Sequence, residues 1–148
     1  MAVLVRKAGV FTSLQGLGRY GQQRYGVAPG GSMDRTAARI ANILAGNDES
    51  EHLLEFHFPG PEIVFGEDRV FALGGADFDA RLDGEPVRNW HRHLARASGV
   101  LSFKKKLGGS RGYLAVDGGL RYDNARSESP FVTERISSGQ TLIAIKDS

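Results

Sequence analysis

The chain has 148 residues, a formal net charge of +2 and a hydrophobic content of 41%, which fits one soluble globular domain. Its basic residues are scattered, which argues against a nucleic-acid-binding protein, and no apolar run approaches the about 18 residues that a membrane span needs. The absence of cysteine excludes disulfides, thiol nucleophiles and zinc–thiolate sites.

The N-terminal third is expected to begin with strand and to continue into a long glycine-rich loop. Met1–Val10 alternates weakly and predicts a first strand, which Phe11–Leu14 continues. Arg6 and Lys7 lie where a signal peptide would need its apolar core, so we expect a cytoplasmic protein. Gln15–Ser32 predicts a loop, and a loop of this length inside a compact domain usually has a function.

Ser32–Asn47 predicts the one main helix, with its regular part at about Met33–Ala45. Ser32 is the expected N-cap, and Asp34 places negative charge in the first turn. Gly46-Asn47 supplies a left-handed C-terminal stop. One apolar face at helical spacing is expected to comprise Met33, Ala37, Ile40, Ala41 and Leu44.

Short strands separated by turn signals are expected after the helix. The predicted strands are Leu53–His57, Glu62–Phe65, Arg69–Leu73, Ala80–Leu82, Val87–Trp90, Val100–Phe103, Gly112–Val116 and Thr141–Ile145. Turns are expected at Gly74-Gly75, Gly108-Gly109 and Asp117-Gly118-Gly119, and Asp83-Gly84 is the clearest tight hairpin. Residues 1–148 are therefore expected to form a single, mainly β domain, a barrel or a sandwich.

Two short patterns resemble catalytic or nucleotide-binding motifs but lack their context. Gly16–Gly21 matches the dinucleotide-binding spacing of glycines, yet Pro29 and further glycines follow where a helix should begin. Gly108–Gly112 matches a nucleophile elbow, yet the apolar strand after it stands where a helix should be. We interpret the second pattern as a hairpin turn.

The histidines and the lysine run have ordinary explanations. His91 and His93 would share one strand face, as would Glu55 and His57, but no third metal ligand is recognisable. We therefore predict no metal site. Lys104–Lys106 is interpreted as a solvated strand edge that discourages further strand pairing.

A stronger signal is a set of polar and glycine residues around the loop and the helix, comprising Arg19, Asp34, Asn42, Asn47, Glu55 and Gly74–Asp77. Arginine can hold a carboxylate, and glycine lets a backbone approach a ligand closely. Two interpretations stay open. Either the set lines a binding cleft, or Asp34 caps the helix, Asn47 stops it and Arg19 pairs with Glu55 or Asp77.

An ordered set of matches resembles the allophanate hydrolase subunit 2 family, which is also described as a biotin-dependent carboxyltransferase domain and as the C subunit of 5-oxoprolinase. The matches cover about residues 8–122 and are Gln15–Arg19, Gly21, Gly26-Val27, Gly30, Met33-Asp34, Ala41-Asn42, Gly46-Asn47, Glu55, Gly60-Pro61, Gly74–Asp77, Tyr113–Val116 and Gly118-Gly119.

The resemblance implies a cyclophilin-like β-barrel and a cytoplasmic enzyme subunit that acts on a small amide such as 5-oxoproline, urea or allophanate. It implies no cofactor bound directly, with ATP or carboxybiotin supplied through a partner similar to allophanate hydrolase subunit 1. We assign proton transfer to Asp34 or Asp77 and anion binding to Arg19. Further substrate contacts are expected from Gln15, Gly18, Asn42, Asn47, Glu55 and Gly75.

Two departures from the family pattern keep an alternative open. Gly16 stands where the family usually has an acidic residue, and the family chain is about twice as long, with two related halves. A separate second half or self-association would then complete a shared site. The alternative is a non-catalytic regulatory protein of the same fold, similar to the family's antagonist of a kinase inhibitor.

Overall fold

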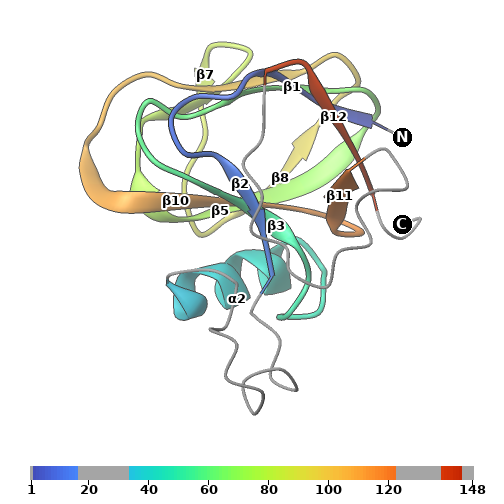
Figure 1. Ribbon diagram of the computed structural model, residues 1–148, viewed down its shortest axis with the longest axis horizontal. Coiled ribbons are helices and arrows are strands. Elements are labelled where there is room, and N and C mark those ends of the chain that lie inside the picture. The colour runs from blue at the N-terminus through green and yellow to red at the C-terminus, as the bar shows by residue number, and fades with distance from the viewer. Residues whose placement is uncertain (1, 17–33, 123–137, 145–148) are drawn as a thin grey trace.

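The structure, a computed structural model, describes residues 2–16, 34–122 and 138–144 (Figure 1). Within these residues, one helix, α2 (Arg35–Leu44), accompanies two antiparallel sheets. The seven-stranded sheet has the order β11 (Leu120–Tyr122), β12 (Gln140–Ala144), β1 (Ala2–Lys7), β4 (Glu62–Phe65), β9 (Val100–Phe103), β6 (Ala80–Leu82) and β7 (Glu85–Pro86). The five-stranded sheet has the order β2 (Ser13–Gln15), β3 (Leu53–Phe56), β10 (Gly108–Val116), β5 (Arg69–Asp77) and β8 (Arg92–Ala95).

For the part of the chain that the structure describes, the mainly β class with one main helix is confirmed, but the closed barrel is not. Within the described residues, β11 and β7 end one sheet and β2 and β8 end the other. The neighbouring strands of both sheets run antiparallel, as expected for short strands joined by turns. The arrangement is two open sheets with α2 against the five-stranded one (Figure 1).

The five-stranded sheet has apolar side chains on both faces because its strands alternate with a period of two. On β10, Leu114 and Val116 enter the main core, whereas Tyr113 and Ala115 face a second cluster under the helix. The main core also takes Phe56, Phe65, Phe71, Leu73 and Leu101, all at most 2% exposed. The sheet therefore separates a large core from a small one.

The smaller cluster consists mainly of alanines, which let α2 lie close to the sheet. It comprises Ala37, Ala38, Ala41, Ala45, Leu53, Ala72, Tyr113 and Ala115, with Leu44 at its edge. The predicted face was wrong at Ile40, which is 40% exposed. Ala38 and Asn42 are buried in its place, because the helix turns its small side chains, not its largest, toward the sheet.

The helix begins at Asp34, whose side chain accepts the N–H of Ala37 at 3.1 Å. Asp34 is therefore the N-cap, and the predicted cap Ser32 lies outside the described residues. The predicted C-terminal stop is confirmed: Gly46 has φ +89°, Gly46 N–H donates to Ile43 O, and Asn47 N–H donates to Asn42 O at 2.8 Å. These paired bonds form a Schellman motif.

Several strand predictions agree with the structure, whereas three glycine-rich or polar segments differ. The tight turn at Asp83-Gly84 is confirmed, with both φ angles positive between β6 and β7. β5 continues through Gly74-Gly75 to Asp77, and Gly108–Gly112 belongs to β10, so neither segment is the predicted turn. The predicted strand Val87–Trp90 was wrong, since only β7 and β8 occupy that region.

Candidate functional site

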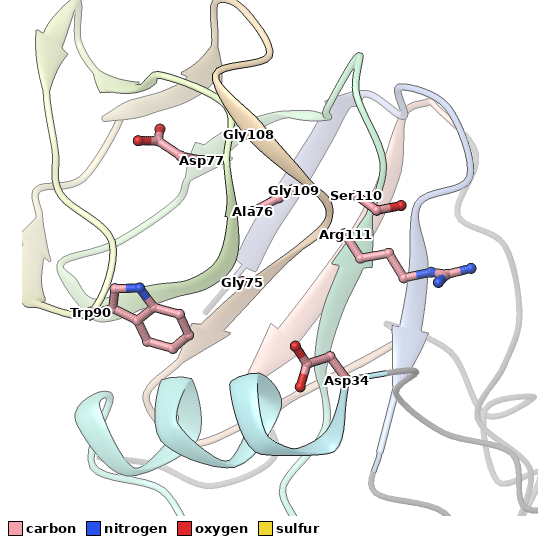
Figure 2. Close-up of a pocket in the computed structure, with 9 residues that line it drawn as sticks. All are labelled: Asp34, Gly75, Ala76, Asp77, Trp90, Gly108, Gly109, Ser110 and Arg111. Carbon is pink, nitrogen blue, oxygen red and sulfur yellow. The ribbon is translucent and has the colours of Figure 1, made fainter.

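A cavity of about 500 Å³ opens where β5, β10 and the first turn of α2 meet (Figure 2). It is lined by Asp34, Gly75, Ala76, Asp77, Trp90, Gly108, Gly109, Ser110 and Arg111. The volume suits a small organic molecule. Both predicted proton-transfer candidates, Asp34 and Asp77, line this one cavity.

Glycine backbone forms one wall of the cavity because the paired strands leave no room for side chains. A Cβ on Gly75 would lie 2.4 Å from Arg111 O, and a Cβ on Gly109 would lie 2.7 Å from Ala76 Cα. The φ angles of Gly75 and Gly109 are +77° and +84°, a region that favours glycine. The wall therefore exposes peptide groups, which can approach a ligand closely.

An irregular pairing of β5 with β10 produces this wall. Gly108 pairs with Asp77 and Gly112 with Gly75, so β10 advances four residues while β5 advances two. The extra residues form a bulge, and bulges redirect side chains at binding sites. Here the bulge brings Ser110 and Arg111 into the cavity lining, and Figure 2 shows both side chains directed away from Trp90.

Asp34 is held at the cavity by a buried tyrosine. The Asp34 N–H donates to Tyr113 Oη at 2.8 Å, and Tyr113 in turn donates to Glu55 Oε2 at 2.6 Å. Figure 2 shows the Asp34 carboxylate directed into the cavity, on the side of Trp90. Asp34 therefore combines a fixed backbone with a carboxylate that a ligand can reach.

The chemistry of the site is dominated by carboxylates and one cation. Burial and the hydrogen bond to Glu55 raise the pKa of Tyr113, so this phenol stays protonated. Glu55, which is buried, also lies 3.9 Å from Arg111 Nε through its Oε1. Arg111 is therefore a cation in the cavity lining that is paired with Glu55, whereas the sequence analysis assigned anion binding only to Arg19.

Asp77 contributes differently from Asp34. Its Oδ1 accepts the N–H of Asp79 at 3.0 Å, and Figure 2 shows its carboxylate directed away from Asp34. Asp77 also lines a second cavity of about 380 Å³, which shares Gly75 and Trp90 with the first. Of the two carboxylates, that of Asp34 is the one directed into the first cavity.

Asn42 and Asn47, which were predicted to bind substrate, do not line the cavity. Asn42 Nδ2 donates to Glu51 O at 2.8 Å, and Asn47 Nδ2 donates to Val116 O at 2.9 Å. Asn47 Oδ1 accepts the N–H of Gly118 at 2.9 Å. These bonds join the end of α2 to the sheet, which is a structural role.

The remaining predicted residues differ in where they lie relative to the cavity. Gln15 is buried on β2, where its Nε2 donates to Ser13 Oγ at 2.9 Å. Glu55 contacts the site through Tyr113 and Arg111, and Gly75 lies in its wall. Arg19 and Gly18 lie outside the described residues.

Sequence reasoning missed Trp90 and the segment Gly108–Arg111. The signal for the latter was present, because two glycine pairs, Gly74-Gly75 and Gly108-Gly109, fall on strands that turn out to be neighbours. Each pair resembles a turn when it is considered alone.

In the described residues no three histidine, aspartate or glutamate side chains gather as a metal site would require, and no described helix has the length and hydropathy to cross a membrane.

Comparison with known proteins gives the family. Residues 25–144 match the model of the carboxyltransferase domain, subdomain A and B. The chain is 40% identical over 114 residues to the C subunit of 5-oxoprolinase from Escherichia coli, covering 77% of this chain and 37% of the relative. It is 35% identical over 120 residues to the urea amidolyase of Saccharomyces cerevisiae, covering 80% of this chain and 6% of the relative.

Solved structures share the fold. The crystal structure of TTHA0988 superposes with a TM-score of 0.88 at 32% identity, covering 100% of this chain and 58% of that chain. The Kluyveromyces lactis urea carboxylase gives a TM-score of 0.86 at 28% identity, covering 98% of this chain and 14% of that chain. The chain spans little more than a third of the 5-oxoprolinase relatives that it matches. On the family model and these relatives, the chain belongs to the carboxyltransferase domain family, subdomains A and B.

Proposed function

We propose that the chain is a subunit of an amide-processing complex of the carboxyltransferase type, with 5-oxoproline as the first substrate to test. The observation that carries the proposal is the cavity at the start of α2, with the Asp34 carboxylate directed into it, a glycine wall beside it and Arg111 in its lining. Relatives named as a 5-oxoprolinase subunit and as urea amidolyase support the choice of substrates.

The residues suit recognition of an amide. A carboxylate such as Asp34 accepts an amide N–H, and the peptide groups of the wall offer further partners. Arginine in the lining binds a carboxylate such as that of 5-oxoproline. Asp34 is the proposed proton-transfer group, since a positioned carboxylate can take or give a proton at the reacting amide.

ATP or carboxybiotin would reach the reaction through other subunits. The proposed partner resembles allophanate hydrolase subunit 1, and a separate second half or a second copy of this chain would complete a shared site. The cytoplasm, where ATP is available, is the proposed location. None of the roles of this chain's residues depends on a cofactor bound in the cavity.

The test is reconstitution. The full chain is purified together with its partner subunits, and ATP hydrolysis is measured with 5-oxoproline, with urea and without substrate. We expect stimulation by one amide, together with release of the opened product. A stable complex that neither amide stimulates would support the regulatory alternative and refute the enzymatic proposal.

Asp34→Asn sharpens this test because asparagine is an equally good N-cap but cannot act as a base. We expect amide-dependent turnover to fall by at least about 100-fold, within the usual range for a lost acid–base group. Asp83→Asn is the matched control, since Asp83 occupies a hairpin turn outside both cavities. Equal losses in both variants would contradict the role of Asp34.

A further inference from the structure

Trp90 has an unusual combination of backbone conformation, exposure and position. Its φ is +65°, which is a genuine outlier for a bulky residue. Its side chain is 42% exposed, so burial of the indole does not explain the conformation. Strained residues of this kind persist only when their surroundings hold them, and they concentrate at binding sites.

The surroundings of Trp90 do hold it. Its backbone N–H donates to Leu73 O at 2.8 Å, and the neighbouring Asn89 donates through Nδ2 to Ala76 O at 2.9 Å and to Gly75 O at 3.2 Å. These bonds fix the segment against β5, next to the cavity wall. The backbone of Trp90 therefore has a set position before any ligand arrives.

The indole itself rests on a glycine. A Cβ on Gly74 would lie 3.0 Å from Trp90 Cζ3 and 3.0 Å from Ala37 O, so the ring lies against bare backbone at the point where β5 passes α2. Trp90 lines both the first and the second cavity. Figure 2 shows it at the end of the first cavity, on the side that the Asp34 carboxylate faces.

We infer that Trp90 is a ligand-contacting residue that holds a planar amide by stacking, while Asp34 accepts the N–H of that amide. The ligand class is a lactam or cyclic ureide with a free N–H. Aromatic faces attract flat π-systems in offset stacks, and a carboxylate facing the cavity selects a donor. The choice of this ligand class rests on the proposed function. The inference adds Trp90 as a residue that determines specificity.

The geometry also accounts for selectivity. An N-methylated lactam keeps the flat ring but has no N–H, so it would leave the Asp34 carboxylate without its bond and place a methyl group against it. A site that is arranged to accept a hydrogen bond from its ligand strongly rejects an analogue that lacks the donor. A saturated amino acid such as proline lacks the planar amide and would stack poorly.

Trp90 is the single tryptophan of the chain, so its fluorescence reports on this site alone. The full chain without partners is titrated with 2-pyrrolidone, 5-oxoproline, N-methyl-2-pyrrolidone and proline, and acrylamide quenching is measured at each point. We expect saturable changes and reduced quenching with the first two. N-methyl-2-pyrrolidone should bind at least about tenfold more weakly, the size of one lost hydrogen bond to a charged group.

Two variants separate binding from folding. In Asp34→Asn, the preference for 2-pyrrolidone over its N-methyl analogue should shrink to within about twofold. The reason is that the side-chain amide of the variant both donates and accepts hydrogen bonds, so it no longer selects a ligand with an N–H. Trp90→Gly removes the ring and accommodates the positive φ, so its thermal midpoint should hold while ligand-detected NMR shows loss of 2-pyrrolidone binding. Binding equal to wild type in Trp90→Gly would overturn the inference.

The outcomes separate this inference from the proposed function. If the reconstituted complex turns over 5-oxoproline while no lactam alters Trp90 fluorescence, the role of Trp90 is refuted and the function stands. If lactams with an N–H saturate the Trp90 signal while the complex shows no amide-dependent activity, the stacking site stands and the enzymatic proposal fails. Equal responses to the N-methylated and the free lactam would refute the role of Asp34 as acceptor and with it the inference.

Discussion

Tyr113 donates to Glu55 across 2.6 Å and at the same time accepts the N–H of Asp34 at 2.8 Å. Its side chain is fully buried, so water cannot replace the hydroxyl easily. Tyr113→Phe should therefore lower the free energy of unfolding by about 1–3 kcal/mol, the cost of leaving buried polar groups unpaired. Urea denaturation followed by circular dichroism measures the change.

Glu55→Gln provides the matched comparison, because the glutamine carbonyl can still accept the Tyr113 hydrogen. The loss of unfolding free energy should be smaller than in Tyr113→Phe. A larger loss in Glu55→Gln would show that the charge near Arg111, not the hydrogen bond, is what the fold depends on.

The Tyr113 phenol also predicts an alkaline limit to stability. Burial and the Glu55 hydrogen bond raise its pKa above the ordinary value of 10.0, so above that pH the unfolded chain releases a proton that the folded chain keeps. The contribution of the protonated Tyr113 phenol to the free energy of unfolding is therefore complete below about pH 10 and is lost as the pH rises beyond it. Between pH 9 and 11, about the window set by that ordinary value, the unfolding free energy of wild type should fall more steeply than that of Tyr113→Phe.

Gly75→Ala tests the glycine wall. Its φ is +77° and an added Cβ would lie 2.4 Å from Arg111 O, so we expect a loss of at least about 2 kcal/mol in unfolding free energy, from strain and from overlap together. Gly84→Ala is the control, because its φ is +85° but nothing lies within 4 Å of the added Cβ. It should lose only about 1–2 kcal/mol; losses of the same size would mean that the strands can separate at Gly75.

Asn47→Ala distinguishes a structural role from substrate binding. Asn47 bonds Val116 O, Gly118 N–H and the Asn42 side chain, so we expect the unfolding free energy to fall by about 1–3 kcal/mol. Binding of 2-pyrrolidone by the folded variant should be unchanged. Unchanged stability with lost binding would instead support the sequence-based prediction that Asn47 contacts substrate.

Much of the fold follows from local pattern. Leu53–Phe56 and Glu62–Phe65 show apolar residues between strong turn signals, and Gly46-Asn47 ends the helix through its left-handed conformation. Such features depend on neighbours in sequence, so one chain suffices to predict them. The N-cap position of Asp34 and the burial of Ala38 depend on how the helix meets the sheet, which the sequence does not display.

The candidate site was predicted only in part because its wall uses glycine in a way that local rules misread. Gly74-Gly75 and Gly108-Gly109 resemble turns, whereas the structure keeps them in paired strands with a bulge. A bulge depends on the register between strands far apart in sequence. Trp90 was missed for a similar reason: its neighbours alternate like a strand, but bonds to Leu73 and Ala76 hold the segment outside the sheets.

The helix is attached to one strand at both of its ends. Tyr113 bonds the backbone of its N-cap residue, and Asn47, just beyond its last turn, bonds the carbonyl of Val116 on the same strand. Rotation of α2 about either contact would stretch the other, so we expect the amide hydrogens of the helix and of this strand to exchange with similar protection. A ligand bound at Asp34 would then raise protection at both ends of the helix, including the turn at Gly118.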